Sequence, residues 1–490
     1  MKQIFSTLIA FCLTAGLTSA ERPPNIIYIL ADDLGYGDLS VLGQEHFETP
    51  HIDRLAEEGM IFTDHYSGST VCAPSRASLL TGKHTGNAPV RGNYEVLPEG
   101  QFPMPEDTFI IPQMLTEAGY TSGIFGKWGL GAPGSVSEPL KMGFDRFYGF
   151  NCQRLAHHYY PYFLWDDDEK EILWENFGLE EGTYAPDLIH KEVMEFIAAN
   201  KDDPFFCYYA IIQPHAEMFA QEHYMEKYRG KFLPESSYEG VDEGPDFRKF
   251  PYGSQPEAHA AFAAMVNAID DYVGDIVAEL EELGIADETL IIFTSDNGTH
   301  REGGHNPDFF DSNGPFRGYK RDLYEGGIRV PMIASWPGTI EPGATTDHVS
   351  AFWDVFPTVA ELAGQPIPAD VDGISFLPTL LGNETNQEEH DYLYWEFHEL
   401  QGRQAIRQGQ WKGVRYNVAT DPDSTIELYD LSQDPGETVN LAEEYPDVAS
   451  ELAVVMAQAR TAHPNARFNF PDGRVIRGTY PGNEGDQSSN

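Results

Sequence analysis

The sequence predicts an α/β fold in which a large sheet lies between helices and a small antiparallel sheet follows. Three apolar runs without polar alternation, 25–30, 204–211 and 288–294, are typical of strands buried on both faces of a sheet. Residues 258–284 carry apolar side chains at helical spacing with acidic residues between them, which predicts a long helix. After residue 385 the chain changes to short β-like segments separated by turns.

Each of the three predicted strands is followed by polar side chains capable of chemistry. The first run leads to Asp32 and Asp33, the second to His215, and the third to Asp296 and Asn297. Open α/β sheets gather their functional groups at the carboxyl ends of the strands. We therefore expect these residues to form one site, although they lie far apart in the sequence.

The remaining elements follow in chain order. A helix is predicted from Pro50 to Gly59, and its apolar stripe, like that of 258–284, is assigned to the core. The predicted C-terminal strands cover 392–397, 404–407, 411–416 and 427–430, with a helix near 445–460. These features divide the chain into a catalytic domain, 21–385, and a C-terminal α+β subdomain, 386–490, whose last ten residues are predicted to be disordered.

The amino-acid composition and the N-terminal segment restrict which binding partners and which cellular location we expect. The 490 residues include 78 acidic and 31 basic side chains, a formal net charge of −47, and no long basic tract, which argues against a nucleic-acid partner. An anionic substrate would require a locally basic pocket against this global field. Residues 1–20 read as a secretory signal peptide, too short and interrupted for a membrane span, so we expect a periplasmic or secreted protein that is not integral to a membrane.

The segment Cys72-Ala73-Pro74-Ser75-Arg76 is the most informative in the chain. It resembles the signature of the type I, formylglycine-dependent sulfatases, an arylsulfatase-like family. The resemblance implies that a formylglycine-generating maturation enzyme oxidises Cys72 to an aldehyde, whose hydrated form carries the attacking hydroxyl. It leaves Cys152 and Cys207 in the mature chain, and the sequence does not decide whether these two form a disulfide.

The four oxygen side chains after the first and third strands predict a cation site. Three carboxylates, Asp32, Asp33 and Asp296, and the amide of Asn297 suit Ca²⁺ or Mg²⁺ and lack the His and thiolate ligands expected for zinc. Their contexts, Asp-Asp-Leu-Gly and Ser-Asp-Asn-Gly, resemble the metal positions of the sulfatases. The resemblance adds the modified Cys72 to this set, and we expect Ca²⁺, with Mg²⁺ as the alternative.

Four further residues match catalytic positions of that family. Arg76 resembles the arginine that steadies the modified residue, Lys127 in Gly-Lys-Trp and Lys320 resemble the two sulfate clamps, and His215 resembles the acid that protonates the leaving alcohol. The matching motifs extend from about Pro24 to the Leu-Tyr-Asp-Leu and Asn-Leu-Ala elements near the end of the chain. The implied fold is that of the alkaline phosphatase superfamily, with a large mixed sheet between helices.

One position departs from the family pattern. The chain has Gly129 where the family has a second His, which the resemblance assigns to the release of sulfate. Either water or the metal suffices for that step here, or another His replaces it, with His300 and His305 as candidates. Arg91, Asn93 and His398 are further candidates for contact with substrate, together with those two histidines. The aromatic run 157–162 is a candidate for stacking on a sugar.

These features predict a sulfuric ester hydrolase that acts on sulfated polysaccharide or oligosaccharide of the galactan or glycosaminoglycan type. Two alternatives stay open: a phosphodiesterase or phosphonate monoester hydrolase with the same nucleophile, and a non-catalytic glycan-binding protein on the same scaffold. The sequence does not indicate which carbon carries the sulfate, whether action is exo or endo, or the oligomeric state.

Overall fold

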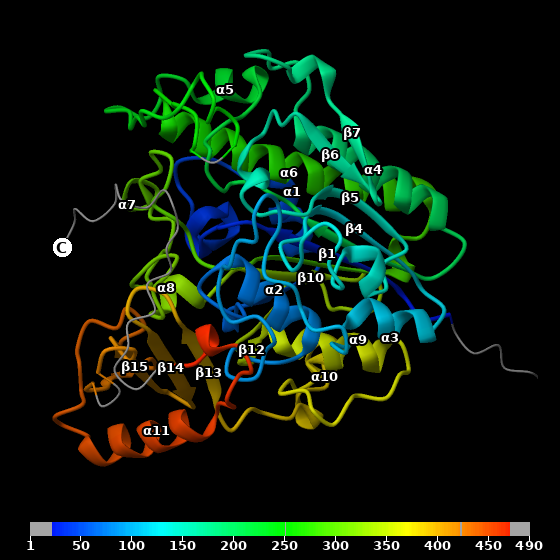
Figure 1. Ribbon diagram of the computed structural model, residues 1–490. Coiled ribbons are helices and arrows are strands. Elements are labelled where there is room, and N and C mark those ends of the chain that lie inside the picture. Colours follow the sequence, from blue (N-terminus) through cyan, green and yellow to red (C-terminus); the bar gives the residue numbers. More distant parts are fainter. Residues whose placement is uncertain (1–21, 250, 422–423, 471–490) are drawn as a thin grey trace, which may run out of the picture.

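The computed structural model describes residues 22–249, 251–421 and 424–470. The predicted signal peptide and the predicted disordered tail lie outside these residues. The described chain forms a large mixed sheet between two layers of helices, with a smaller antiparallel sheet beside it (Figure 1). The fold predicted from the sequence is confirmed.

The large sheet has ten strands in the order β11-β2-β10-β9-β1-β8-β4-β5-β6-β7. Its five central strands, from β9 to β5, run parallel, whereas β10, β6 and β7 introduce antiparallel pairs. The strands, in chain order, are β1 Asn25–Ala31, β2 Met60–Phe62, β4 Thr121–Lys127, β5 Arg146–Phe150, β6 Phe163–Asp166, β7 Glu169–Ile172, β8 Phe205–Ala210, β9 Thr289–Ser295, β10 Met332–Ser335 and β11 Ala344–Thr346.

Strand β1 shows why the predicted strands lack polar alternation. Ile27 and Ile29 point into one hydrophobic cluster, and Ile26, Tyr28 and Leu30 point into another on the opposite face. Because successive side chains of a strand alternate between faces, a strand that is covered on both sides must be apolar throughout.

Helices cover both faces of the sheet (Figure 1). One face packs against α1 Pro50–Glu57, α4 Ala185–Asn200, α5 Glu222–Tyr228 and α6 Ala258–Leu283. The other packs against α2 Cys72–Thr81, α3 Ile111–Glu117, α9 Val355–Leu362 and α10 Leu377–Leu380. The helix predicted at 258–284 thus ends at Leu283, where Gly284 takes a left-handed conformation (φ +71°) that favours glycine.

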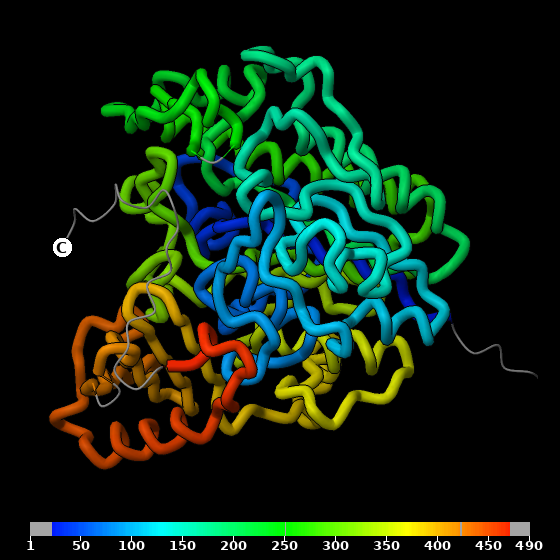
Figure 2. Tube along the Cα trace, in the orientation of Figure 1, coloured from blue at the N-terminus to red at the C-terminus, as the bar shows by residue number. Residues whose placement is uncertain are grey.

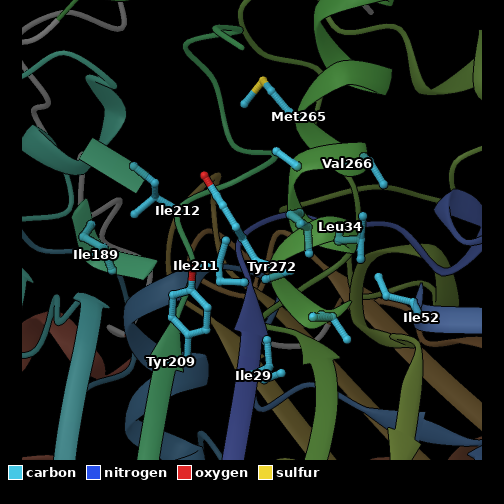
Figure 3. Close-up of a cluster of buried hydrophobic side chains, with 14 of the residues drawn as sticks. Ile29, Leu34, Ile52, Ile189, Tyr209, Ile211, Ile212, Met265, Val266 and Tyr272 are labelled. Atoms are coloured by element: carbon cyan, nitrogen blue, oxygen red, sulfur yellow. The ribbon is translucent and has the colours of Figure 1, made fainter. Parts of the chain in front are cut away.

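Figure 3 shows the cluster between the sheet and α6. Ile29 of β1 and Tyr209 of β8 lie below Met265, Val266 and Tyr272 of α6, all at most 5% exposed. Each such side chain contributes roughly 1.5–3 kcal/mol by burial. This packing fixes the strands whose carboxyl ends carry the polar residues.

A second sheet is built from the C-terminal part of the chain, coloured orange to red in Figure 2. Its four antiparallel strands are β13 Leu393–Phe397, β14 Arg403–Gln408, β15 Trp411–Tyr416 and β16 Glu427–Asp430, and α11 Pro446–Gln458 packs against it. The predicted domain boundary near 385 falls in the short helix η8 Glu384–Asn386.

Four more short elements are the parallel pair β3 His65–Tyr66 and β12 Ser350–Ala351, and the helices α7 Pro307–Phe310 and α8 Glu325–Ile328. Cys72, Cys152 and Cys207 are buried and free, so no disulfide joins the last two. Among the described residues, no helix is both long enough and apolar enough to span a bilayer.

Candidate active site

The register of β1 against β9 brings the two acidic pairs together. Ala31 lies opposite Ser295 in this parallel pair, so Asp32 and Asp33 leave the sheet beside Asp296. The Asp33 amide donates to Asp296 Oδ1 at 3.2 Å. The predicted shared site at the carboxyl edge of the sheet is therefore a direct consequence of strand pairing.

The oxygen cluster has the properties of a site for a hard cation. All four side chains are at most 1% exposed, and Asn297 Nδ2 donates to Asp33 Oδ1 at 2.6 Å while Asn297 Oδ1 has no hydrogen-bond partner. Burial, reinforced by the neighbouring Asp32 carboxylate, raises the pKa of Asp296 to about 7. Crowded carboxylates and an unpartnered amide oxygen fit the predicted Ca²⁺ or Mg²⁺.

Cys72 is the first residue of α2 and lies on this cluster. Its Sγ donates to Asp32 Oδ1 at 3.5 Å, and the Cys72, Asp32, Asp33 and His215 ligand atoms lie within 4.8 Å of one another. Burial, together with the Asp32 carboxylate, raises the pKa of the thiol well above its ordinary value. A thiol that stays protonated is a poor nucleophile, which agrees with a requirement for chemical modification at this position.

Arg76 lies one turn further along α2 and fixes this helix to the sheet edge. Its guanidinium donates to Asp296 Oδ2 through Nε at 3.1 Å and Nη2 at 2.8 Å, and Nη1 donates to the Lys127 carbonyl at 2.6 Å. The side chain is fully buried. Arg76 therefore joins α2 to the ends of both β9 and β4.

Two buried ammonium groups flank the cluster. Lys127 Nζ lies 2.5 Å from Asp32 Oδ2, and Lys320 Nζ lies 2.7 Å from Asp33 Oδ2. Burial alone would lower the pKa of each lysine, but Asp32 and Asp33 respectively raise it above its ordinary value. Both lysines are thus charged and able to bind the oxygens of a tetrahedral anion.

His215 follows β8 and faces the same space. Its Nδ1 donates to the carbonyl of Ala216, and its Nε2 accepts from Lys320 Nζ at 2.9 Å and lies 3.3 Å from Asp33 Oδ2. Burial and the Lys320 charge hold the pKa of His215 well below its ordinary value. The ring is therefore oriented by its backbone bond, with Nε2 directed at the centre of the site.

Four neighbours of His215 were not identified from the sequence as parts of the reaction centre. The ring of His157, from η4 Leu155–His157, stacks on that of His215 with centroids 4.3 Å apart. Glu302 Oε2 lies 3.7 Å from His215 Nε2, and Glu302 also contacts Arg321 and Tyr252. Only two had a weak sequence signal: Arg321 directly follows Lys320, and His157 belongs to the aromatic run assigned to sugar stacking.

Two of the predicted substrate contacts require correction. Arg91 is 1% exposed, and its guanidinium donates to Glu396 Oε1 at 3.1 Å and to the Thr461 carbonyl at 2.9 Å. His398 Nε2 lies 2.9 Å from the same carboxylate oxygen. Both side chains belong to a buried network that joins the catalytic body to the C-terminal sheet, so we assign them structural roles.

Asn93 lies beside the backbone of Ala73, the residue after Cys72. Its Oδ1 accepts from the Ala73 amide at 3.0 Å, and its own amide donates to Glu399 Oε1 at 3.3 Å. Asn93 therefore links the start of α2 to a carboxylate of the C-terminal subdomain.

His300 and His305 are also fixed by structural contacts. His300 Nε2 donates to the Pro214 carbonyl at 3.1 Å, and its Nδ1 accepts from the Glu302 amide at 3.0 Å. His305 stacks on Phe262 with centroids 3.8 Å apart, inside the hydrophobic layer. The expectation that one of them replaces a second catalytic His stays a prediction: both ring nitrogens of His300 are bonded, one of them to the Glu302 amide, whereas His305 Nδ1 has no hydrogen-bond partner among the described residues.

Gly129 could not simply carry a larger side chain. It has φ +71°, and a Cβ atom would lie 2.6 Å from Gln153 Nε2 and 2.8 Å from Gln153 Cγ. Gln153, which follows β5, is 4% exposed. Its side chain occupies the space that a histidine at 129 would need.

The chain is similar to known proteins along nearly its whole length. Residues 24–365 match the family model described as Sulfatase, and residues 314–462 match that of N-sulphoglucosamine sulphohydrolase, C-terminal. The chain is 33% identical over 508 residues to N-acetylgalactosamine-6-sulfatase of Rattus norvegicus, covering 91% of this chain and 86% of the relative. It is also 33% identical over 517 residues to human arylsulfatase A, with coverage of 96% and 93%.

Solved structures with similar folds include proteins solved with carbohydrate. Ps i-CgsB in complex with k-i-k-neocarrahexaose aligns with a TM-score of 0.73 and 27% identity, covering 93% of this chain and 96% of that one. A protein from work on glycosaminoglycan metabolism by Bacteroides thetaiotaomicron aligns at 0.71 and 26%, covering 90% and 100%. The phosphonate monoester hydrolase of Agrobacterium radiobacter, at 22% identity, a TM-score of 0.63 and coverage of 89% and 95%, shares the fold.

Proposed function

The chain belongs to the sulfatase family and hydrolyses sulfate esters, and from this premise we propose that its substrate is a sulfated polysaccharide or oligosaccharide of the galactan or glycosaminoglycan type. Relatives and structural neighbours whose names specify such sugars support this class of substrate. The observation that carries the proposal is the position of His215 Nε2, 2.9 Å from Lys320 Nζ at the edge of the cluster. A sugar alkoxide is a poor leaving group and needs a proton donor at this place, whereas a phenolate does not.

The position of each residue in the site indicates its role in the reaction. Formylglycine made from Cys72 would supply the attacking hydroxyl, and a cation held by Asp32, Asp33, Asp296 and Asn297 would polarise the sulfate oxygens. Lys127 and Lys320 compensate the charge of the sulfate group from two sides. Arg76 ties α2 to the end of β9, and His215 Nε2, which accepts from Lys320 Nζ in the resting site, would pass a proton from that ammonium to the leaving alcohol.

We propose Ca²⁺ as the resident ion, since its flexible coordination suits a buried cluster with three carboxylates and one amide. We also propose a periplasmic or secreted location, supported by the signal-like residues 1–20.

The test uses protein co-expressed with a formylglycine-generating enzyme. Mass spectrometry of the peptide that contains residue 72 should show the aldehyde, and the peptides with Cys152 and Cys207, which are buried but lie outside the signature, should keep their thiols. Ion chromatography should detect sulfate released from carrageenan or chondroitin sulfate oligosaccharides, and Cys72→Ala should release none.

A phosphodiester, bis(4-nitrophenyl) phosphate, serves as the competing substrate in the same assay. Turnover of this diester with no sulfate release from any sulfated oligosaccharide would contradict the proposed substrate. Full activity of protein that contains only unmodified Cys72 would contradict the proposed nucleophile.

A further inference from the structure

A carboxylate, Glu302, and a guanidinium, Arg321, form a pair beside His215, outside the four oxygen ligands assigned to the cation. Ligand atoms of Glu302, Asp33 and His300 lie within 4.8 Å of one another. Glu302 Oε1 lies 2.5 Å from Arg321 Nη2, and Glu302 Oε2 lies 3.7 Å from both His215 Nε2 and Lys320 Nζ. The Tyr252 hydroxyl donates to Glu302 Oε2 at 2.8 Å. The pair is thus on the side of the site where His215 meets the leaving alcohol.

The backbone holds both partners in place. Arg321 has φ +79°, a left-handed conformation that costs energy for any residue with a Cβ atom. Its amide donates at 3.0 Å to the carbonyl of Thr70, two residues before the nucleophile, and its carbonyl accepts from Arg403 of β14. The amide of Glu302 donates to His300 Nδ1 at 3.0 Å. The strained Arg321 backbone is therefore fixed from two sides, next to the reaction centre.

Both side chains keep contact with the open part of the site. Glu302 is 16% and Arg321 34% exposed, in contrast to Lys127, Asp32 and Asp33, whose side chains are at most 1% exposed. Each carboxylate oxygen of Glu302 has one contact to Arg321 or Tyr252 and can accept another hydrogen bond. Arg321 has further N–H donors beyond the one at Glu302.

The charge of this pair determines what it can bind. Burial opposes ionisation of Glu302, but Arg321 and Lys320 hold its pKa well below the ordinary value, so the pair is an ionised carboxylate and a guanidinium with no net charge. Glu399, whose carboxylate also interacts electrostatically with Arg321, lies nearby. A second sulfate would meet carboxylates here, whereas a hydroxyl can donate to Glu302 and accept from Arg321.

We propose that Glu302 and Arg321 form a subsite for the free sugar hydroxyl nearest to the sulfate ester. The proposal rests on the carbohydrate substrate proposed above. When the ester oxygen of the sugar lies at His215 Nε2, the hydroxyl on the adjacent carbon comes within reach of Glu302 Oε2. The reason is that His215 Nε2 and Glu302 Oε2 are 3.7 Å apart. The subsite selects a sugar whose hydroxyl next to the sulfate ester is free, and it rejects a sugar in which that hydroxyl is also sulfated.

Binding measurements test this subsite without turnover. In a Cys72→Ala background, isothermal titration calorimetry would compare the galactose 2-, 3-, 4- and 6-sulfates and the 4- and 6-sulfates of N-acetylgalactosamine. The best ligand would then be compared with its analogue that lacks the neighbouring hydroxyl and with its neighbouring disulfate. We expect the parent to bind about tenfold or more tightly than the deoxy analogue, as for a site built to bond a hydroxyl.

Glu302→Gln and Arg321→Gln should reduce the ratio of the affinity for the parent sugar to the affinity for its deoxy analogue to near one. Glu302→Gln should also weaken discrimination against the disulfate. Asp308→Asn is the matched control, since Asp308 of α7 is a 62% exposed carboxylate that pairs with Arg301, the residue before Glu302. Unchanged affinity for inorganic sulfate and an unchanged melting temperature would show that the variants are folded with the sulfate position intact.

The outcomes separate the two proposals. A parent-to-deoxy ratio in Glu302→Gln equal to that of the background protein would overturn the subsite while leaving the carbohydrate substrate in place. Binding of inorganic sulfate with no binding of any sulfated sugar would overturn both.

Discussion

The ring of His157 lies nearly parallel to that of His215, with an interplanar angle of 11° and centroids 4.3 Å apart. His215 Nδ1 is bonded to its own backbone neighbour, so the stack and this bond together fix the plane of the ring. Burial and the surrounding cations hold the pKa of both rings well below the ordinary value, which leaves both neutral in the resting site. Two neutral rings stack without the repulsion that two imidazolium ions would have.

The first prediction concerns the acid. His215→Ala should lower kcat on sugar sulfates by about 10²-fold or more but on 4-nitrophenyl sulfate by less than about tenfold, because a phenolate leaves without a proton. Steady-state kinetics on both substrates with the same enzyme preparation check this. Equal losses on the two substrates would reject the acid role of His215.

The second prediction separates support from proton transfer at His157. His157→Phe keeps a flat ring for the stack, whereas His157→Ala removes it, so we expect His157→Phe to retain most of kcat and His157→Ala to lose about three- to tenfold. His305→Ala, in the hydrophobic layer against Phe262, should lower the melting temperature more than kcat. A loss in His157→Phe as large as that in His215→Ala would mean that His157 itself transfers a proton.

Much of this site could be predicted because strand ends determine it. Asp32, Asp33, Asp296 and Asn297 follow apolar runs, and the parallel pairing of β1 with β9 leaves little freedom in where such residues meet. Glu302, in contrast, lies in an irregular stretch after β9, where neither period 2 nor period 3.6 indicates its direction.

The errors at Arg91 and His398 share one partner, Glu396 on β13. The Arg91 contact exists only because the C-terminal sheet packs against the loop after α2, and local sequence gives no information about such a long-range contact. His398 reaches Glu396 from two residues away, and its pairing depends on how the chain turns after β13. The polar residues looked free for a substrate, whereas tertiary packing had already paired them.

The third prediction concerns the cation. EDTA should abolish activity and Ca²⁺ should restore it, and Asp296→Ala should lose both the bound metal and turnover, measured by mass spectrometry of metals after dialysis. Asp271→Asn is the control, because Asp271 belongs to a different acidic group, near His51 and Asp270. Metal affinity should weaken as the pH falls through about 7, since Asp296 must lose its proton to bind. Recovery with zinc alone would contradict the assigned ligand set.

The fourth prediction concerns the junction of the two sheets. Lys412 Nζ of β15 is fully buried and lies 2.7 Å from Glu325 Oε1 of α8 and 3.1 Å from Glu437 Oε1. Lys412→Met removes the ammonium from Glu325 Oε1 and Glu437 Oε1 and leaves Arg329 as the cation paired with Glu325, so it should lower the free energy of unfolding by about 3–5 kcal/mol. Lys141→Met, which removes a half-exposed ion pair to Glu138, should stay within about 1 kcal/mol of wild type. Equal urea midpoints for the two variants would show that the buried cluster does not stabilise the junction.

The last prediction uses pH and a carboxyl group outside the cation cluster. Asp38, in η1 Tyr36–Asp38, is fully buried, accepts from the Gly35 amide at 2.7 Å through Oδ2, and has no partner at Oδ1. Burial, with a smaller contribution from Asp311, raises its pKa from 3.8 to about 8. The folded protein therefore holds a proton here that the unfolded chain releases at a much lower pH.

The sign of the effect follows from this difference. A raised pKa in the folded state contributes stability below the unfolded value, and that contribution is lost as the pH rises from about 4 through about 8, at up to about 1.4 kcal/mol per pH unit. Asp38→Asn keeps an acceptor for Gly35 and cannot ionise, so the unfolding free energy of wild type relative to Asp38→Asn should fall between pH 5 and pH 8. Urea unfolding at the two pH values measures it, with Glu57→Gln on the exposed face of α1 as the control for losing one negative charge. A difference between wild type and Asp38→Asn that does not change with pH would show that Asp38 is already ionised in the folded protein.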